Sequence, residues 1–232
     1  MSTRPKKNLQ REKKPYGARK TQKGSSKNSN LKTESGSYRI IGGSWRSRRL
    51  SFPVIEGLRP TTDRVRETVF NWVSTEIHGA HVLDVFSGSG SLGLEALSRG
   101  AVKLTAIEKN KQAVLALQSN IELLTQNDNS DVHVKVIHAD ALSHLGSFNK
   151  DKSGAADAED SYDLIFLDPP FRKGLLEEVV ALLDGHPLVQ TDALIYIERE
   201  KEMPMLSVPE SWRLLKDKSA GQVVYQLFRV GA

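Results

Sequence analysis

Short apolar runs alternate with amphipathic stretches along most of this 232-residue chain. Continuous apolar runs predict buried strands, whereas apolar positions repeated every three or four residues predict helices. Strands are expected at residues 81–86, 102–107, 132–138, 162–167 and 193–198. Helices are expected at residues 63–77, 94–99, 111–125 and 174–183. This alternation predicts an α/β fold in which a doubly wound, mostly parallel sheet carries helices on both faces.

Both ends of the chain depart from this alternation. Residues 212–216 and 223–229 predict a closing antiparallel hairpin, and residues 38–52 predict an N-terminal hairpin that turns at Gly42-Gly43. Residues 1–37 contain too few apolar side chains to form a core, so we expect a disordered basic tail. The chain should therefore consist of the tail (1–37), the N-terminal β-hairpin and loop (38–62), and an α/β domain (63–232).

Basic residues are concentrated near the N-terminus. Residues 1–37 hold 11 Lys and Arg against 2 acidic residues, and residues 38–66 hold 7 Arg against 2 acidic residues. The remaining 166 residues hold 15 basic and 24 acidic side chains. Such asymmetry predicts a polyanionic partner for the N-terminal quarter. The tail itself has two interpretations, an RNA-binding arm or a solubility element. A mitochondrial transit peptide fits it less well, because it lacks an amphipathic apolar face.

The second strand of the N-terminal hairpin is expected to carry Arg46, Arg48 and Arg49. Trp45 stands among these guanidinium groups and would offer an aromatic surface on which an unpaired base could stack. The pattern therefore indicates contact with single-stranded RNA.

Composition removes several classes of function. The chain has no cysteine, which excludes disulfides, thiolate zinc sites and the cysteine nucleophile of pyrimidine C5-methyltransferases. It contains no apolar run long enough to span a membrane and no apolar stretch typical of a secretory signal. Its six histidines show no metal-ligand spacing, so we expect no metal site.

A glycine-rich loop follows the first strand of the α/β domain. Gly88, Gly90 and Gly93 precede a helix and fit the spacing that lets a backbone turn tightly and approach a ligand closely. Glu108 ends the next strand, twenty positions after Gly88, where an acid can accept hydrogen bonds from both hydroxyls of a ribose. These features predict a ribose-bearing cofactor but do not separate a nicotinamide dinucleotide from S-adenosylmethionine.

The tetrapeptide Asp168-Pro169-Pro170-Phe171 ends the strand at 162–167. Two prolines fix the backbone and remove two N–H donors, so their carbonyls are presented rigidly beside an acid and an aromatic ring. Open α/β sheets bind ligands at this end of their strands. The arrangement suits the recognition of a planar base by its exocyclic amino group, although a capped Pro-rich turn would have the same sequence.

Three segments together resemble the RsmD family, the bacterial 16S ribosomal RNA (guanine-N2)-methyltransferases: residues 38–46, 58–72 and 168–175. The resemblance extends over residues 38–229. Residues 1–37 fall outside it, and the insert at 146–161 is longer and more polar than the family leads us to expect. The tetrapeptide resembles the [D/N/S]-P-P-[Y/F/W] motif of amino-methyltransferases, which favours S-adenosylmethionine over a dinucleotide.

Several expectations follow from this resemblance. It implies a Rossmann-like class I methyltransferase fold with seven strands, the last of them antiparallel, so that residues 63–232 would be the methyltransferase domain. It also implies S-adenosylmethionine as cofactor without a metal, and N2 of a guanine, guanine 966, as target. The implied partner is 16S ribosomal RNA or a small-subunit assembly particle. We expect a cytoplasmic monomer.

The resemblance also implies roles for individual residues. Asp84 would hold the cofactor's ammonium group through water, Glu108 its ribose, and Asp140 its adenine amino group, although Asp84 and Asp140 could instead be turn caps. The residues expected to bind cofactor are Asp84, Phe86, Gly88, Gly90, Glu108, Asp140 and Ala141. The residues expected to act in catalysis are Asp168, Pro169, Pro170 and Phe171. The residues expected to contact RNA are Arg39, Trp45, Arg46, Arg48, Arg49 and Arg59.

Two other functions remain open at this point. Methyltransferases that act on adenine N6 of DNA or on protein glutamine use closely related tetrapeptides. A catalytically silent RNA-binding protein on the same scaffold is a further possibility. The basic N-terminal region favours RNA over protein, and the intact Asp168 with its upstream glycine loop argues against a silent protein.

Overall fold

A computed structural model describes residues 1–3, 35–56, 58, 60–126, 132–148 and 161–231. The predicted tail from residue 4 to 34, Arg59 and residues 149–160 of the insert lie outside the described residues. Thr33–Ala232 form one compact unit, which contains all the elements named below. None of the helices within the described ranges is long and apolar enough to cross a membrane.

Nine strands and five helices make up the described part of the chain. The strands are β1 (Ser35–Arg39), β2 (Arg49–Pro53), β3 (His81–Asp84), β4 (Lys103–Glu108), β5 (His133–His138), β6 (Tyr162–Leu167), β7 (Val189–Glu200), β8 (Trp212–Ala220) and β9 (Val223–Val230). The helices are α1 (Asp63–Trp72), α2 (Gly93–Ser98), α3 (Lys111–Thr125), α4 (Ala141–Gly146) and α5 (Leu175–Leu183).

Seven of the strands form one sheet in the order β5-β4-β3-β6-β7-β9-β8. Strands β3 to β7 are mutually parallel, and β9 pairs antiparallel with both β7 and β8. The predicted doubly wound, mostly parallel sheet with a terminal antiparallel hairpin is therefore confirmed. The strand order reverses between β3 and β6, and this is where sheets of this type place their ligands.

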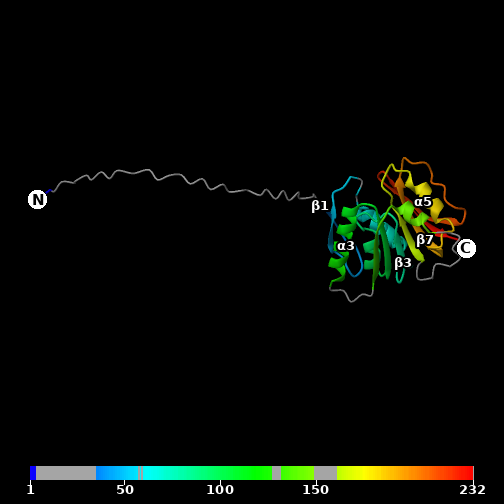
Figure 1. The fold of residues 1–232 in the computed structure, drawn as a ribbon, viewed down its shortest axis with the longest axis horizontal. Coiled ribbons are helices and arrows are strands. Elements are labelled where there is room, and N and C mark those ends of the chain that lie inside the picture. Colours follow the sequence, from blue (N-terminus) through cyan, green and yellow to red (C-terminus); the bar gives the residue numbers. More distant parts are fainter. Residues whose placement is uncertain (4–34, 57, 59, 127–131, 149–160, 232) are drawn as a thin grey trace. The chain divides into compact units, whose positions relative to one another are not determined.

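Two apolar cores lie on opposite faces of this sheet, because alternate side chains of each strand point to opposite sides. In β6, for example, Phe166 belongs to the core that includes residues of α1, α2, α3 and the N-terminal hairpin, whereas Ile165 belongs to the core that includes residues of α4 and α5. Figure 1 shows β1 and α3 on one side of the sheet and α5 on the other. Burial on both faces explains why the strands read as continuous apolar runs.

Strands β1 and β2 form a separate two-stranded antiparallel sheet. Strand β1 begins at Ser35, so the fold starts before the expected boundary at residue 38. Strand β2 lies against α3, where Asn120 donates a hydrogen bond to the Ser51 carbonyl at 2.8 Å and accepts one from the Ser51 N–H at 3.3 Å. The hairpin thus packs on the α/β domain through specific polar contacts.

The largest differences from the expected elements concern α1, β7 and α4. Helix α1 ends at Trp72 rather than near residue 77, because Val73 leaves the helical conformation before the poor helix formers Ser74 and Thr75. Strand β7 begins at Val189, four residues earlier than expected. Helix α4 was not predicted, because six residues are too few to show a helical period.

Candidate active site

Acidic side chains stand at the carboxyl ends of five adjacent strands. In sheet order they are Asp140 after β5, Glu108 on β4, Asp84 on β3, Asp168 after β6 and Glu198 on β7. The residue pairs Asp84↔Phe166 and Leu167↔Ile197 put Asp168 between Asp84 and Glu198 in neighbouring strands. The parallel sheet therefore collects carboxylates at one edge from positions up to 114 residues apart. Four of the five were expected from the sequence, and Glu198 was not.

The glycine-rich loop between β3 and α2 needs glycine for two reasons. Gly88 and Gly90 have φ angles of +51° and +77°, a region that other residues rarely adopt. A Cβ atom on Gly90 would also lie only 2.4 Å from Leu117 Cδ1. The turn is closed by the Gly90 N–H, which donates to the Ser87 carbonyl at 2.6 Å. Glycine at these positions thus allows both the turn itself and its close packing against α3.

Asp84 is buried beneath this loop. Its Oδ2 accepts a hydrogen bond from the Gly93 N–H at 3.2 Å, while its Oδ1 is buried without a hydrogen-bond partner among the described residues. Burial, with smaller contributions from the nearby carboxylates of Asp168 and Glu108, raises the Asp84 pKa to about 7 against the lowering effect of the Gly93 hydrogen bond. A cationic ligand group would satisfy the unpaired oxygen and favour the charged carboxylate.

Glu108, at the end of β4, is hydrogen-bonded to the glycine-rich loop. Glu108 accepts hydrogen bonds from the N–H groups of Gly88 at 2.9 Å and Asn110 at 2.6 Å. Each carboxylate oxygen has a second lone pair, so Glu108 keeps acceptor capacity for a ligand hydroxyl. The hydrogen bond from the Gly88 N–H directly joins the glycine-rich loop and Glu108, the two features of the predicted ribose site.

Asp140 caps helix α4. Its Oδ1 accepts from the N–H and Oγ of Ser143 at 3.1 and 3.0 Å, and its Oδ2 pairs with Lys109 Nζ at 3.0 Å. The hydrogen bond from Lys109 is the main reason that the Asp140 pKa lies below its ordinary value. The turn-cap role is therefore present, and the two roles are compatible because Asp140 remains partly exposed. Ala141, the first residue of α4, is buried, and Phe86 is half-buried beside the glycine loop.

The residues of the tetrapeptide after β6 differ in their exposure to solvent. Pro169 is buried, whereas the ring of Phe171 is 46% exposed and open to stacking. Asp168 Oδ2 accepts a hydrogen bond from Thr61 Oγ1 at 3.1 Å. Burial raises the Asp168 pKa to about 6, against the lowering effect of the Thr61 hydrogen bond. A hollow beside the tetrapeptide is lined by Pro169, Pro170, Phe171 and Glu198, among other residues.

Glu198 and Tyr196 lie on β7, the strand next to the one that Asp168 follows. Tyr196 OH donates to Glu198 Oε2 at 2.9 Å, and both residues are buried. Burial and the neighbouring Asp168 carboxylate raise the Glu198 pKa to about 8. Sequence reasoning did not single out this pair, although Glu198 ends the expected strand at 193–198 just as the other acids follow theirs, and that position was the available signal.

The N-terminal segment contacts both site loops. Tyr38 OH donates to the Ser89 carbonyl at 3.0 Å, and Leu58 Cδ1 lies 2.9 Å from where a Cβ atom on Gly88 would stand. Thr61 bonds Asp168 as described above. The hairpin and its following loop are therefore part of the site's structure.

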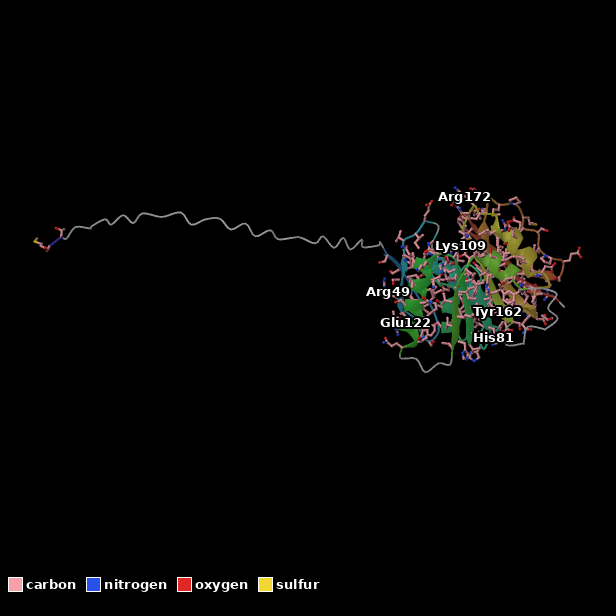
Figure 2. All side chains as sticks on the ribbon, viewed as in Figure 1. Arg49, His81, Lys109, Glu122, Tyr162 and Arg172 are labelled. Carbon is pink, nitrogen blue, oxygen red and sulfur yellow. The ribbon has the colours of Figure 1, made fainter. Side chains whose placement is uncertain are left out.

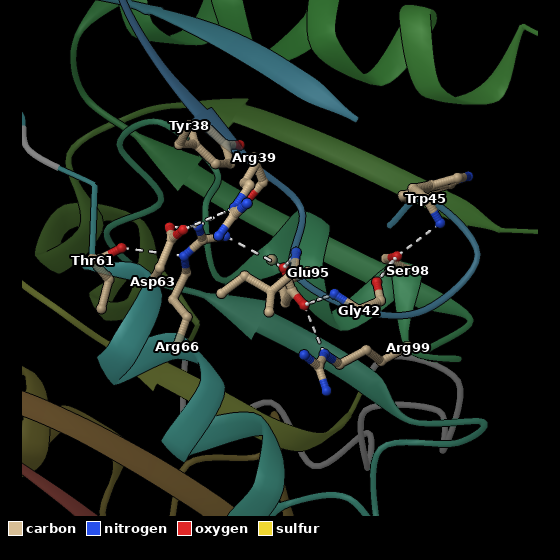
Figure 3. Close-up of polar contacts among 12 residues, drawn as sticks. Tyr38, Arg39, Gly42, Trp45, Thr61, Asp63, Arg66, Glu95, Ser98 and Arg99 are labelled. Carbon is tan, nitrogen blue, oxygen red and sulfur yellow. Dashed lines mark hydrogen bonds and ion pairs between the residues drawn. The ribbon is translucent and has the colours of Figure 1, made fainter. Parts of the chain in front are cut away.

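A buried polar network holds the hairpin connection in place (Figure 3). Glu95 on α2 accepts hydrogen bonds from the N–H groups of Ile41 and Gly42, both at 2.8 Å, and pairs with Arg99 at 2.7 Å and with Arg66 at 3.3 Å. The side chains of Glu95 and Arg66 are fully buried. These contacts give a structural role to Arg66, which lies in the segment 58–72 that the sequence analysis used only as a family signature.

The predicted RNA contacts have mixed outcomes. Trp45 does not offer a stacking surface: it is 4% exposed and belongs to the apolar core, which its size and lack of charge favour. Arg46 and Arg48 lie in the β1–β2 connection and not on the second strand. Arg48 donates to the Leu123 carbonyl of α3 at 2.8 Å, and Arg39 pairs with Asp63 at 3.1 Å.

Two groups of exposed cations lie at the hairpin and directly after the tetrapeptide. Arg46 and Arg49 are exposed at the hairpin, and Figure 2 shows Arg49 on the flank that also carries Glu122 of α3. Arg172 and Lys173 are exposed directly after Phe171, and Figure 2 shows Arg172 at the end of the sheet opposite His81 and Tyr162, the first residues of β3 and β6. Sequence reasoning did not single out Arg172 and Lys173, although their position next to Phe171 was the available signal.

Comparison with known proteins identifies the family. A family model described as Conserved hypothetical protein 95 matches residues 38–229. The chain is 44% identical over 195 residues to ribosomal RNA small subunit methyltransferase D of Escherichia coli strain K12, which covers 84% of this chain and 91% of that protein. The chain belongs to the RsmD family. A protein of the same name from Haemophilus influenzae is 42% identical over 194 residues, covering 84% of this chain and 94% of that protein. The family predicted from three sequence segments is thereby confirmed.

Solved structures agree with the RsmD assignment. Escherichia coli yhhF, described as a candidate methyltransferase, matches with a TM-score of 0.72 at 41% identity, covering 85% of this chain and 99% of that chain. The Thermus thermophilus 16S rRNA N2 G1207 methyltransferase RsmC, solved with AdoMet and guanosine, matches with a TM-score of 0.56 at 17% identity. The match covers 85% of this chain and 50% of that chain. The latter likeness shows the fold alone. Together they confirm the class I methyltransferase fold.

Proposed function

We propose that this RsmD-family protein transfers a methyl group from S-adenosylmethionine to the exocyclic N2 of a guanine in 16S ribosomal RNA, guanine 966 by family. The observation that carries the proposal is the position of Asp168, Pro169 and Phe171 at the carboxyl edge of the sheet, directly beside the strand that leads into the glycine loop. The names of the relatives, ribosomal RNA small subunit methyltransferase D, support the RNA and its subunit.

The residues around the glycine loop fit S-adenosylmethionine. Asp84 Oδ1 is a buried oxygen without a partner among the described residues, which suits the ligand's ammonium group. Gly88 and Gly90 give the loop its positive φ angles, and Glu108 retains lone pairs for ribose hydroxyls. Asp140 and the first N–H groups of α4, including that of Ala141, suit the adenine edge. Two solved proteins of the same fold, RsmC and SMU.776, carry AdoMet and SAH respectively.

The residues after β6 suit an aromatic amine as methyl acceptor. S-adenosylmethionine, when bound, supplies an electrophilic methyl group on a positively charged sulfur. Asp168 and the Pro169 carbonyl would accept one hydrogen bond from each amine hydrogen, turning the nitrogen lone pair toward that methyl group. Phe171 would stack on the base after it leaves its helix. Holding both reactants in line accounts for much of the acceleration.

The proton balance of the reaction involves Asp168. As the nitrogen gains a methyl group it must lose one proton, and the partly buried carboxylate is placed to receive it. A pKa near 6 lets Asp168 be ionised before the transfer and release the proton to water afterwards at neutral pH. No step requires a strong base, because the methylated ammonium nitrogen is itself acidic.

RNA is the proposed partner, with the exposed cations of the hairpin and of the segment after Phe171 as its contacts. Arg46 and Arg49 on one side and Arg172 and Lys173 on the other would bind phosphates, which fixes the register of the RNA without reading its sequence. We propose that the basic tail adds further phosphate contacts, that Arg59 joins them, and that a cytoplasmic monomer acts on the RNA or on an assembly particle.

The function is tested by mass mapping of methylated nucleosides. The full chain is incubated with labelled S-adenosylmethionine and either 16S RNA or small subunits from a deletion strain, and the RNA is digested to nucleosides. N2-methylguanosine at one site is expected. Labelled N6-methyladenosine, or label in protein only, would replace this function with one of the other two methyltransferase classes.

Two variants separate chemistry from base capture. Asp168→Ala should lower the single-turnover rate by about 10²- to 10³-fold while S-adenosylmethionine affinity stays near wild type, because the lost acceptor acts only on the substrate amine. Phe171→Ala should mainly weaken RNA binding, by about 1–3 kcal/mol for a lost base stack. A folded Asp168→Ala protein with near-normal transfer would remove Asp168 from the mechanism.

A further inference from the structure

The hydroxyl of Thr61 is the side-chain donor that the structure gives to Asp168. Thr61 is 6% exposed, and its Oγ1 lies 3.1 Å from Asp168 Oδ2 although the two residues are 107 positions apart. A hydroxyl has one proton, and here that proton is directed at the carboxylate. The neighbouring Thr62 differs in each respect, because it is exposed and its side chain makes no capping hydrogen bond.

The backbone of Thr61 is itself held in place. The Thr61 carbonyl accepts a hydrogen bond from Arg66 Nε at 3.2 Å. The fully buried Arg66 also donates to the Arg39 carbonyl at 2.8 Å and pairs with Asp63 at 2.7 Å. Arg66 also pairs with Glu95, which leads to the hairpin connection (Figure 3). Thr61 therefore stands on a fixed support that reaches from α1 and α2 to the hairpin.

The hydrogen bond from Thr61 gives the two carboxylate oxygens of Asp168 different roles. Because Oδ2 accepts from Thr61, the carboxylate is fixed in rotation and Oδ1 is left as the acceptor for a substrate group. Hydrogen bonds to a carboxylate also favour its charged form, which opposes the effect of burial at Asp168. A carboxylate free to rotate or to hold a proton would be a poorer acceptor for an amine.

We propose that Thr61 is a positioning residue for methyl transfer: its hydroxyl, seated by Arg66, holds the Asp168 carboxylate in the orientation that accepts the target amine. This inference rests on the proposed function, because it concerns the same acceptor. Thr61 contacts neither reacting atom. The titratable groups that act on Asp168 from the elements around it are Asp84 on β3 and Tyr196 and Glu198 on β7.

Three substitutions in the full chain test the proposal. Thr61→Val removes the hydroxyl and keeps the shape, Thr61→Ser keeps the hydroxyl and removes a methyl group, and Thr62→Val makes the same chemical change at the exposed neighbour. Single-turnover methyl transfer to unmethylated 16S RNA is measured from pH 5 to 9 at saturating S-adenosylmethionine. Calorimetry gives S-adenosylhomocysteine affinity, and urea unfolding gives stability.

Thr61→Val should lower the transfer rate by about 10- to 100-fold, the range expected for losing a hydrogen bond to a charged group. The acidic limb of its rate–pH profile should move to higher pH, because Asp168 loses a contact that favours its charged form. Thr61→Ser should recover most of the rate, and Thr62→Val should match wild type. S-adenosylhomocysteine affinity should be unchanged in all three.

Other outcomes have distinct meanings. If wild type methylates RNA but Thr61→Val keeps both its rate and its pH profile, Thr61 fills space only and the inference is wrong while the proposed function stands. Failure of Thr61→Ser to recover activity has the same meaning. Absence of transfer by wild type would overturn the function and this inference together. Thr61→Ala, which places no methyl group against the carboxylate, supplies the comparison if Thr61→Val does not fold.

Discussion

Replacing Glu198 with glutamine should stabilise the folded protein at alkaline pH. Glu198 is 7% exposed, lies next to Asp168 in the sheet, and has a pKa raised from an ordinary 4.5 to about 8 by burial and by that neighbour. A buried acid whose pKa is higher in the folded state binds its proton more tightly there. Its contribution to stability is therefore complete below about pH 4.5 and is lost as pH rises toward 8.

The size of the effect follows from the shift. Each pKa unit corresponds to 1.36 kcal/mol, so a carboxyl with the full shift would cost about 5 kcal/mol of unfolding free energy between pH 4.5 and 9. Water and small rearrangements that reach the ionised carboxylate reduce this cost, so the net gain expected for glutamine is about 2–4 kcal/mol. Removing the Glu198 charge also relieves its partner Asp168, which acts in the same stabilising direction. Glutamine keeps an oxygen that can accept from Tyr196 OH, now at 2.9 Å from Glu198 Oε2.

The assay is urea unfolding at pH 5, 7 and 9, followed by tryptophan fluorescence and by circular dichroism to check two-state behaviour. Glu198→Gln should be close to wild type at pH 5 and clearly more stable at pH 9. Asp84 and Asp168 also have raised pKa values, so the variant should still lose some stability as pH rises. Glu202→Gln, the same change at an exposed position after β7, should follow wild type. Parallel curves for Glu198→Gln and wild type would refute the reasoning.

Two further predictions concern the ligands. Wild-type affinity for S-adenosylmethionine should rise as pH passes through about 7, because Asp84 ionises there and can pair with the ligand's ammonium group. Asp84→Asn should lose this pH dependence in calorimetry from pH 6 to 8. Equal pH dependence in both proteins would exclude Asp84 as the partner of the ammonium group. Deleting residues 2–32, which leaves all of β1, should make RNA affinity less dependent on salt because up to 11 cations are removed. If the slope of log affinity against log salt concentration is unchanged, the tail is a solubility element.

The sequence predicted the main sheet well, because burial on both faces produces a signal that does not depend on distant parts of the chain. The predicted bounds of the helix at 111–125 and the strand at 162–167 are those observed, and the other central strands begin or end within a few residues of their expected positions. Helix α4 was missed because six residues show no clear helical period, and the start of β7 was missed because the polar residues 190–192 interrupt its apolar run after Val189.

The candidate site was predictable where its residues end strands and unpredictable where a distant loop supplies them. Asp84, Glu108, Asp140 and Asp168 each follow an apolar run, so their shared edge could be expected, and Glu198 could have been found in the same way. Thr61 reaches Asp168 from the loop before α1, a contact that only the tertiary structure shows. Trp45 was misplaced because local sequence shows an aromatic ring among arginines but not the core that covers it.

The hairpin and the catalytic edge are best understood as one rigid assembly. Glu95 is fully buried, and four donors from Ile41, Gly42, Arg66 and Arg99 compensate the cost of removing its charge from water. Movement of the hairpin away from α2 would strip two of these donors from a buried carboxylate, which costs several kcal/mol. The same movement would pull on Arg66 and so on Thr61, the donor to Asp168. If RNA binds the hairpin as proposed, it would therefore meet an Asp168 carboxylate whose position is already set. The division at residues 62 and 63 expected from the sequence runs through this assembly.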